Sequence, residues 1–152
     1  MINNSSSEEP TAVFFPVEQD DNGHPSVSRE QIWCLPGEKG RFIVNNIPFY
    51  ARDISMGDEI STDIRNGEWW FSTLTKPSQN TTIRAFARKP EVAQKLVPRL
   101  QSFGGLTEKM EGSPLVAVSL PPAADIAGVL DYLDRESDAG NVAFEESCVR
   151  YR

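Results

Sequence analysis

The first half of the chain alternates apolar and polar residues with the two-residue period of β-strands, interrupted by frequent turn signals. Asn66-Gly67 is a strong hairpin signal, and the segment 37–40 fits a second hairpin turn. Short strands that share Phe, Trp and Ile side chains are typical of a small antiparallel β-barrel or a curled sheet. Pro16 lacks a backbone donor, which favours a sheet edge for the first strand. The expected strands are residues 12–18, 27–35, 41–45, 59–65 and 68–75.

Residues 41–60 are the centre of this pattern. Apolar side chains recur along the stretch, and Met56-Gly57-Asp58 predicts a tight turn into the next strand. Pro48 removes a backbone donor, so Ile47–Tyr50 cannot be a central strand and is expected to be a stiff crossing.

In the second half, strands alternate with helix-like segments. Residues 90–103 have apolar positions at helical spacing, and Pro98 inside them predicts a kink or two short helices. A second helix is expected after Pro121-Pro122, with Gly140 as its stop. The expected strands are residues 81–87, 106–111, 115–120 and 142–149. This β-α-β-β-α-β order predicts a ferredoxin-like domain, in which two helices cover one face of a four-stranded antiparallel sheet.

The predicted fold class is therefore α+β. We expect a disordered tail at residues 1–10, a β-rich domain at residues 11–76 and a ferredoxin-like domain at residues 81–150. The tail has neither the basic start nor the apolar run of a signal peptide, and no later segment is apolar enough to span a bilayer, so a cytoplasmic protein is expected. Cys34 and Cys148 lack metal or redox spacing and are expected to be reduced, buried thiols.

The chain carries 22 acidic and 15 basic residues, a formal net charge of −7. Residues 1–80 hold most of the excess, with twelve acidic and six basic side chains. This balance argues against binding to nucleic acid or to an anionic membrane, because both need Lys and Arg. It suits a basic protein partner, although solubility alone would also account for it. The oligomeric state stays open.

The sequence offers few groups for catalysis. His24 is the single histidine and lies in a Gly-His-Pro loop, without the nucleophile and carboxylate that a catalytic triad needs. The pairs Asp58-Glu59 and Glu145-Glu146 are split between the two faces of a strand. One histidine and two scattered cysteines are too few for a transition-metal site. We expect no catalytic residues, no metal and no cofactor, and hence no enzyme; a buried pocket of carboxylates with raised pKa would reverse this.

Trp69-Trp70 stands out among the apolar residues. On a strand, one of two neighbouring side chains faces inward and the other outward, and an aromatic anchor ringed by charge is typical of protein interfaces. The alternative is that both tryptophans are buried, one in the core of each half.

Three short motifs resemble an uncharacterised bacterial family of domains of unknown function. They are Pro16-Val-Glu-Gln-Asp20, Ile47-Pro-Phe-Tyr-Ala51 and Ile54-Ser-Met-Gly-Asp58, followed by a strand with Thr82-Ile-Arg84. The resemblance implies no activity and no catalytic residues. In size and acidity, such proteins are similar to immunity proteins, which neutralise a secreted toxin; this is an analogy of class.

The leading hypothesis is a cytoplasmic immunity protein that binds a cognate basic toxin, with a nuclease as the preferred class, and covers its active-site cleft. The alternative is a ferredoxin-like regulatory module that binds a small metabolite on its exposed sheet face, with Arg84, Phe86 and Cys148 as candidate residues. The predicted toxin-binding residues are acidic or aromatic side chains of the β-rich half. They are Asp20, Asp21, Asp53, Asp58, Glu59, Asp63, Glu68, Trp69 and Trp70.

Overall fold

The structure, a computed structural model, describes residues 9–151. The chain divides into two compact units, with the boundary between Ser78 and Gln79. The expected disordered tail lies outside the described residues except for Glu9 and Pro10, which are exposed and belong to no regular element.

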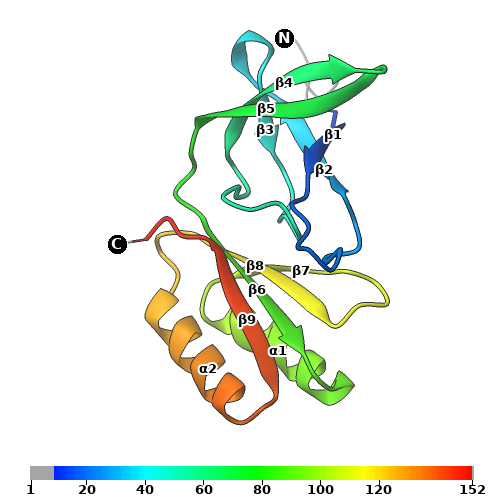
Figure 1. The fold of residues 1–152 in the computed structure, drawn as a ribbon. Coiled ribbons are helices and arrows are strands. Elements are labelled where there is room, and N and C mark those ends of the chain that lie inside the picture. The colour runs from blue at the N-terminus through cyan, green and yellow to red at the C-terminus, as the bar shows by residue number, and fades with distance from the viewer. Residues whose placement is uncertain (1–8, 152) are drawn as a thin grey trace. The chain divides into compact units, whose positions relative to one another are not determined.

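The first unit is a closed five-stranded barrel with the strand order β1-β2-β3-β4-β5 (Figure 1). β1 pairs antiparallel with β2 and parallel with β5, and the parallel contact joins Val13 to Trp69 and Phe14 to Trp70. The predicted barrel is thus confirmed and the open curled sheet is excluded. An edge position for the first strand is wrong, because β1 has a partner on each side and Pro16 is its last residue. The strands are β1 Thr11–Pro16, β2 Arg29–Pro36, β3 Phe42–Val44, β4 Glu59–Arg65 and β5 Glu68–Lys76.

Alternate residues of these strands form the barrel core. The Phe15 ring stacks on the Phe71 ring with centroids 4.9 Å apart. The Cys34 thiol is fully buried in this core, and burial raises its pKa to about 12, because the thiolate would lose its hydration. The fully buried side chains of the core include Val13, Phe15, Ile32, Cys34, Val44 and Ile60.

The β4–β5 hairpin turns at Asn66-Gly67, as the sequence predicts. Both residues have positive φ, 50° for Asn66 and 78° for Gly67. A type I′ turn requires positive φ at both central positions, and its twist matches that of the flanking strands. The register of the hairpin shifts between Ser61 and Thr62, where one strand bulges against the other.

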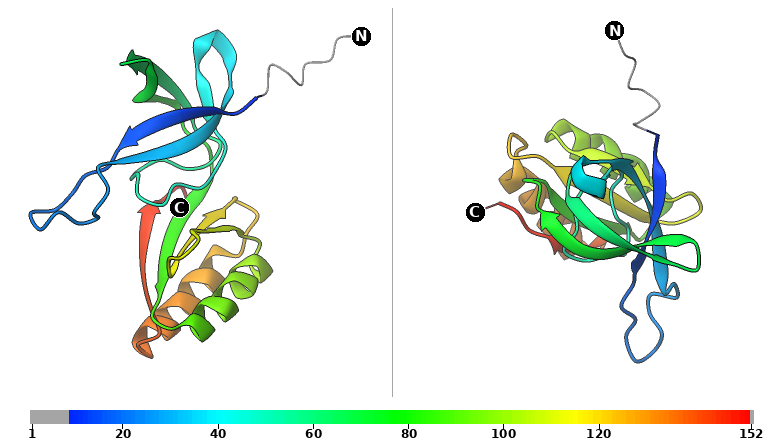
Figure 2. Two further views of the ribbon diagram at one scale, coloured as in Figure 1. Left: turned by 90° about the vertical axis from the view of Figure 1, so that its right-hand side faces the viewer. Right: turned by 90° about the horizontal axis from the view of Figure 1, so that it is seen from above.

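The second unit is an antiparallel sheet with the order β7-β8-β6-β9, and both helices lie on one face of it (Figures 1 and 2). Ile83 and Ala85 of β6 and Val118 of β8 point toward the helices and are fully buried with Leu96 and Leu133. The coarse prediction, an α+β chain with a barrel followed by a helix-covered antiparallel sheet, is confirmed. The elements are β6 Thr81–Ala87, α1 Pro90–Ser102, β7 Leu106–Lys109, β8 Leu115–Leu120, α2 Ile126–Asp138 and β9 Val142–Cys148.

Helix α1 is a single helix that contains Pro98, so the predicted alternative of two short helices is wrong. The proline leaves the carbonyl of Gln94 without its helical donor. Pro98 and Gln94 are both exposed, so that carbonyl can be hydrated. The helix therefore continues past Pro98, because the unpaired carbonyl lies on the solvent-facing side; on the buried side of the helix it would lack a donor.

No helix among residues 9–151 has both the length and the apolar character that a membrane crossing requires.

Candidate functional site

A buried carboxylate holds the crossing segment 47–51 on the barrel. Glu30 of β2 points inward and is nearly fully buried. Its Oε2 accepts a hydrogen bond from the backbone N–H of Phe49 at 2.6 Å, and its Oε1 accepts from Tyr50 and Ala51, both at 2.9 Å. Three successive backbone donors thus converge on one side chain, and this fixes the segment that Pro48 keeps out of the sheet. Sequence reasoning missed Glu30, because its partners lie about twenty residues away along the chain.

Asp58, one of the predicted binding residues, is fully buried. Its Oδ2 accepts from the Ser55 N–H at 2.9 Å, and its Oδ1 accepts from the Ser78 N–H at 2.7 Å. Asp58 therefore ties the turn before β4 to the segment after β5 and cannot lie on a docking surface, which corrects its assignment.

Glu59 is also engaged within the barrel. Its carboxylate accepts from the Thr75 hydroxyl at 2.7 Å and lies 3.3 Å from Arg41 Nη1. The Thr75 hydroxyl, followed by the Arg41 guanidinium, lowers the pKa of Glu59. These contacts stabilise the β3–β4–β5 side of the barrel, so a role for Glu59 in contacting a partner would require breaking them.

The β4–β5 hairpin exposes an apolar pair. Ile64 of β4 lies directly opposite Trp69 of β5, and their side chains are 64% and 37% exposed. The Trp69 ring makes an edge contact with the buried Phe42 ring, with centroids 5.3 Å apart, and this contact fixes the orientation of the Trp69 ring. An exposed tryptophan held by a buried ring is a rigid anchor for a partner, because little side-chain entropy is lost on binding. Ile64 was not among the predicted residues, although its cross-strand position follows from the Asn66-Gly67 turn.

Trp70 lies on the opposite face of β5, in an aromatic and arginine cluster on the outside of the barrel. Its ring is 5.7 Å from Phe14, and the guanidinium of Arg65 lies 5.3 Å from its centroid. Arg29 lies over Phe14 at 4.2 Å and pairs with Glu68, at 3.1 and 3.2 Å from its two carboxylate oxygens. The two tryptophans thus face opposite sides, as alternation predicts, and neither belongs to a buried core.

The remaining predicted acids are exposed but lie apart from one another. Asp63 shares the outer face with Trp70, its cross-strand partner. Asp20 and Asp21 lie in the loop after β1, which extends away from the strands in both views of Figure 2. Asp20 is engaged within that loop: it accepts hydrogen bonds from the N–H groups of His24 and Asn22, and these lower its pKa, His24 most of all.

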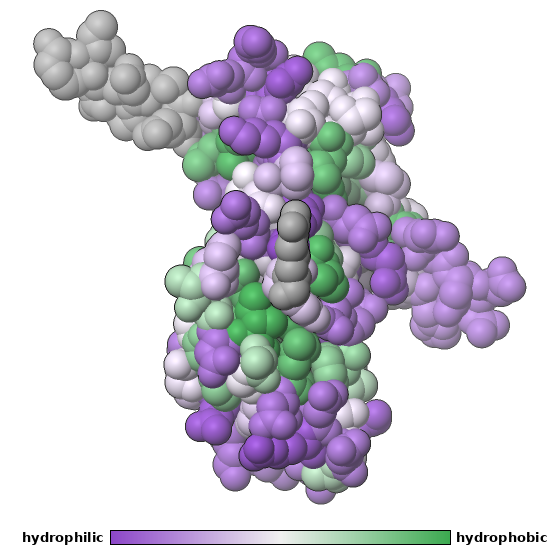
Figure 3. All heavy atoms as spheres, turned by 90° about the vertical axis from the view of Figure 1, so that its left-hand side faces the viewer, coloured by the Kyte–Doolittle hydropathy of each residue, from purple (hydrophilic) through white to green (hydrophobic). Residues whose placement is uncertain are grey.

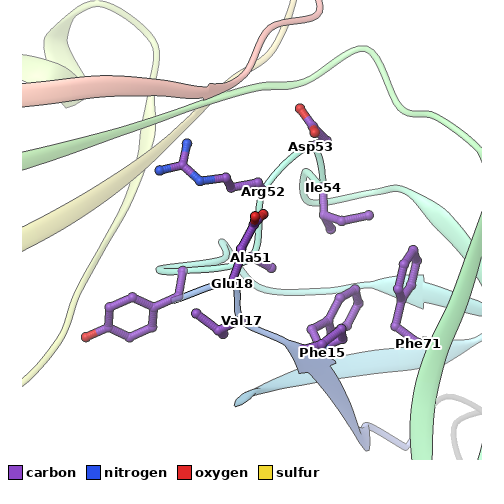
Figure 4. Close-up of a pocket in the computed structure, with 10 residues that line it drawn as sticks. Phe15, Val17, Glu18, Ala51, Arg52, Asp53, Ile54 and Phe71 are labelled. Carbon is purple, nitrogen blue, oxygen red and sulfur yellow. The ribbon is translucent and has the colours of Figure 1, made fainter. Parts of the chain in front are cut away.

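Asp53, the last of them, lies at the rim of a hollow of about 380 Å³ at one end of the barrel (Figure 4). The rings of Phe15 and Phe71 form one side of the hollow with Ile54, and the charged ends of Glu18 and Arg52 lie on the other side. Asp53 has a φ of 62°, the left-handed conformation that Asp tolerates better than most residues. The crossing segment held by Glu30 supplies one wall, so the hollow is built on fixed backbone.

The predicted residues therefore separate into three places. The hairpin holds Trp69, Trp70, Asp63 and Glu68. The loops hold Asp20, Asp21 and Asp53, of which Asp53 alone lines the hollow. Asp58 and Glu59 form hydrogen bonds within the barrel unit. On the face drawn in Figure 3, apolar side chains reach the surface of both units between hydrophilic areas. The hairpin carries both kinds of predicted residue, with Trp69 on one face and Asp63 and Glu68 on the other face with Trp70.

Within residues 9–151, no group of three or more His, Cys, Asp or Glu side chains is arranged to hold a metal ion. His24 Nδ1 lies 3.8 Å from Asp20 in the exposed loop. The Asp20 carboxylate accepts hydrogen bonds from backbone N–H groups of the same loop, as in a turn closed by an Asp side chain.

The fold thus defines a two-unit α+β protein with an aromatic surface on its barrel. Residues 30–144 match a family described as a domain of unknown function (DUF4265), and the chain belongs to that family. The expectation of a family without an assigned function is confirmed. The match begins after the motif Pro16–Asp20 and includes the ranges of the other two motifs.

A solved structure has a similar fold. It is described as a novel crystal structure of a hypothetical protein from Neisseria gonorrhoeae, and it shares 20% sequence identity with this chain. The two superpose with a TM-score of 0.79 over 95% of this chain and 98% of the other. At this identity the likeness concerns the fold. The comparison with curated proteins found no match.

Proposed function

We propose that this chain is an immunity protein, which binds a basic toxin domain and blocks its active-site cleft. The observation that carries the proposal is the exposed Ile64–Trp69 pair on the β4–β5 hairpin, supported from beneath by Phe42. Exposed aromatic anchors on rigid elements are the residues that contribute most to protein interfaces.

Charge supports the choice of a basic partner. Residues 1–78 carry twelve acidic and six basic side chains, and Asp63 is exposed on the same hairpin as the apolar pair, on its opposite face. A nuclease has a basic cleft because its substrate is a polyanion, so an acidic surface can occupy that cleft in place of the substrate. The negative potential would speed association, whereas Trp69 and Ile64 would slow dissociation.

The proposal places the protein in the cytoplasm, where a nuclease reaches its substrate. The residues proposed to contact the toxin all belong to the first unit. The strand order β7-β8-β6-β9 and the position of both helices on one face support a ferredoxin-like arrangement for that unit.

The direct test is co-purification with the toxin-like product of a neighbouring gene, combined with protection of cells that express it. The purified pair should bind more slowly at high salt. Trp69→Ala should raise the dissociation rate about tenfold or more and abolish protection. Asp63→Asn should chiefly slow association.

Trp33→Ala is the matched control, because Trp33 is a tryptophan of β2 that is 48% exposed and lies outside the hairpin. It should bind and protect like the wild type. Full protection by Trp69→Ala, or equal losses in Trp69→Ala and Trp33→Ala, would exclude the hairpin as the interface. A chain that neither binds nor protects against any such product is not an immunity protein.

A further inference from the structure

A second hollow, of about 390 Å³, lies within the second unit. It is formed where β6 ends, α1 begins and the β7–β8 turn passes. The backbone there is fixed, because the Ala87 N–H donates to the Pro114 carbonyl and the Arg88 N–H donates to the Asn141 carbonyl, each at 3.0 Å. The hollow therefore has a rigid frame and walls made by side chains.

The charged side chains that line this hollow are all cations: Arg88, Lys89 and Lys109. All three are exposed, and none forms an ion pair with another residue among 9–151. The charge of the hollow is thus opposite in sign to the formal net charge of −7 of the chain. The three cations can therefore bind an anion, and a ligand with two or more negative charges would balance most of their charge.

Phe86, near the end of β6, also lines the hollow and is 45% exposed. An exposed aromatic face beside cations suits a planar ring, because stacking removes apolar surface from water while the charges hold the anionic end. Of the three residues expected on the open sheet face, Arg84 and Cys148 are buried, and Arg84 lies 3.3 Å from Glu145. Phe86 remains as the exposed member.

We propose that this hollow binds a small phosphorylated compound with a planar ring, the chemistry of a nucleoside monophosphate. Arg88, Lys89 and Lys109 contact the phosphate, and Phe86 stacks on the ring. The hollow has the volume of an ordinary small-ligand pocket. The inference goes beyond toxin binding and uses no residue of the barrel.

The test is the thermal unfolding midpoint of the full chain with AMP, GMP, CMP and UMP, beside adenosine and inorganic phosphate at equal ionic strength. Calorimetry then gives the dissociation constant of the monophosphate that raises the midpoint most. The double variant Lys89→Gln/Lys109→Gln should bind it about tenfold more weakly or worse, since each change removes a charge-assisted hydrogen bond. Phe86→Ala should weaken binding of the nucleotide and leave binding of inorganic phosphate unchanged.

The matched control is Lys39→Gln/Lys95→Gln, which removes two exposed charges away from the hollow. It should bind like the wild type. Trp69→Ala should also keep nucleotide binding, so failure of the barrel proposal and failure of this one are distinguishable. The inference is overturned if no monophosphate raises the midpoint, if adenosine acts as strongly as AMP, or if the control loses as much affinity as the double variant.

Discussion

The Glu30 carboxylate accepts a hydrogen bond of 2.6 Å from the backbone N–H of Phe49, nineteen residues further along the chain. The next two N–H groups, of Tyr50 and Ala51, point at the same carboxylate. The crossing segment thus owes its path to a side chain of β2 as well as to its own proline. Because the segment also forms a wall of the barrel hollow, Glu30 positions that hollow without lining it.

Glu30→Ala should lower the free energy of unfolding by about 2–4 kcal/mol, because three backbone donors lose a charged acceptor. Urea denaturation followed by tryptophan fluorescence measures the change. Gln31→Ala, an exposed neighbour on the same strand, is the control and should have little effect. An unchanged midpoint in Glu30→Ala would mean that water replaces the carboxylate at no cost.

The burial of Asp58 leads to a second prediction. Asp58→Asn should destabilise the barrel by about 1–3 kcal/mol, since the amide replaces one of two charged acceptors by a donor. Asp63→Asn, the same change at an exposed position, should stay within about 0.5 kcal/mol of the wild type. Parallel denaturation curves of the two variants give the comparison, and equal effects would contradict the structural role of Asp58.

Glu59 should make the stability of the barrel depend on acid. Its folded-state pKa lies below the ordinary value of 4.5, so its ionised form stabilises the fold above that pH. The contribution is lost as the pH falls through the folded-state pKa and the carboxylate is protonated. Glu59→Gln should therefore lower the urea midpoint at pH 7, and the difference from the wild type should shrink as the pH falls through the lowered folded-state pKa of Glu59. A difference that stays constant with pH would assign the effect to packing; Glu38→Gln is the exposed control.

Pro98 should be a position where stability can be gained. Pro98→Ala restores a backbone N–H donor for the Gln94 carbonyl on the exposed side of α1 and should raise the free energy of unfolding by about 1–3 kcal/mol. The gain is reduced by the greater conformational entropy of the unfolded chain without this proline. Pro90→Ala is the matched control, because Pro90 begins the helix, where a proline costs nothing. The thermal unfolding midpoints of Pro98→Ala and Pro90→Ala give the comparison. A lower midpoint for Pro98→Ala than for the wild type would show that contacts of the proline ring stabilise the fold.

Much of this fold could be predicted because its signals are local. Asn66-Gly67 determines its hairpin through the φ values of two residues, and β8 is apolar at every position except Ser119. The prediction that Pro16 lies on an edge strand was wrong because the second partner of β1 is distant in the sequence. The pairing of β1 with β5 joins residues more than fifty positions apart, and nothing near Pro16 indicates it.

The candidate site was less predictable, because acidity alone does not distinguish an exposed carboxylate from a buried one. Asp58 and Asp63 are only five positions apart, yet one is enclosed by backbone donors and the other faces solvent. The Asn66-Gly67 turn places Ile64 opposite Trp69, but Ile64 was overlooked because an isoleucine alone gives no sign of a binding surface. Pairing register, rather than residue type, defines the surface.

The parallel junction of β1 with β5 also determines where the chain can be cut. A polypeptide that began after Pro16 would leave β2 and β5 each with an open row of backbone donors and acceptors. Such rows recruit strands from other molecules, so that fragment should aggregate on expression. Shortened versions for crystallisation or NMR therefore have to start no later than Thr11.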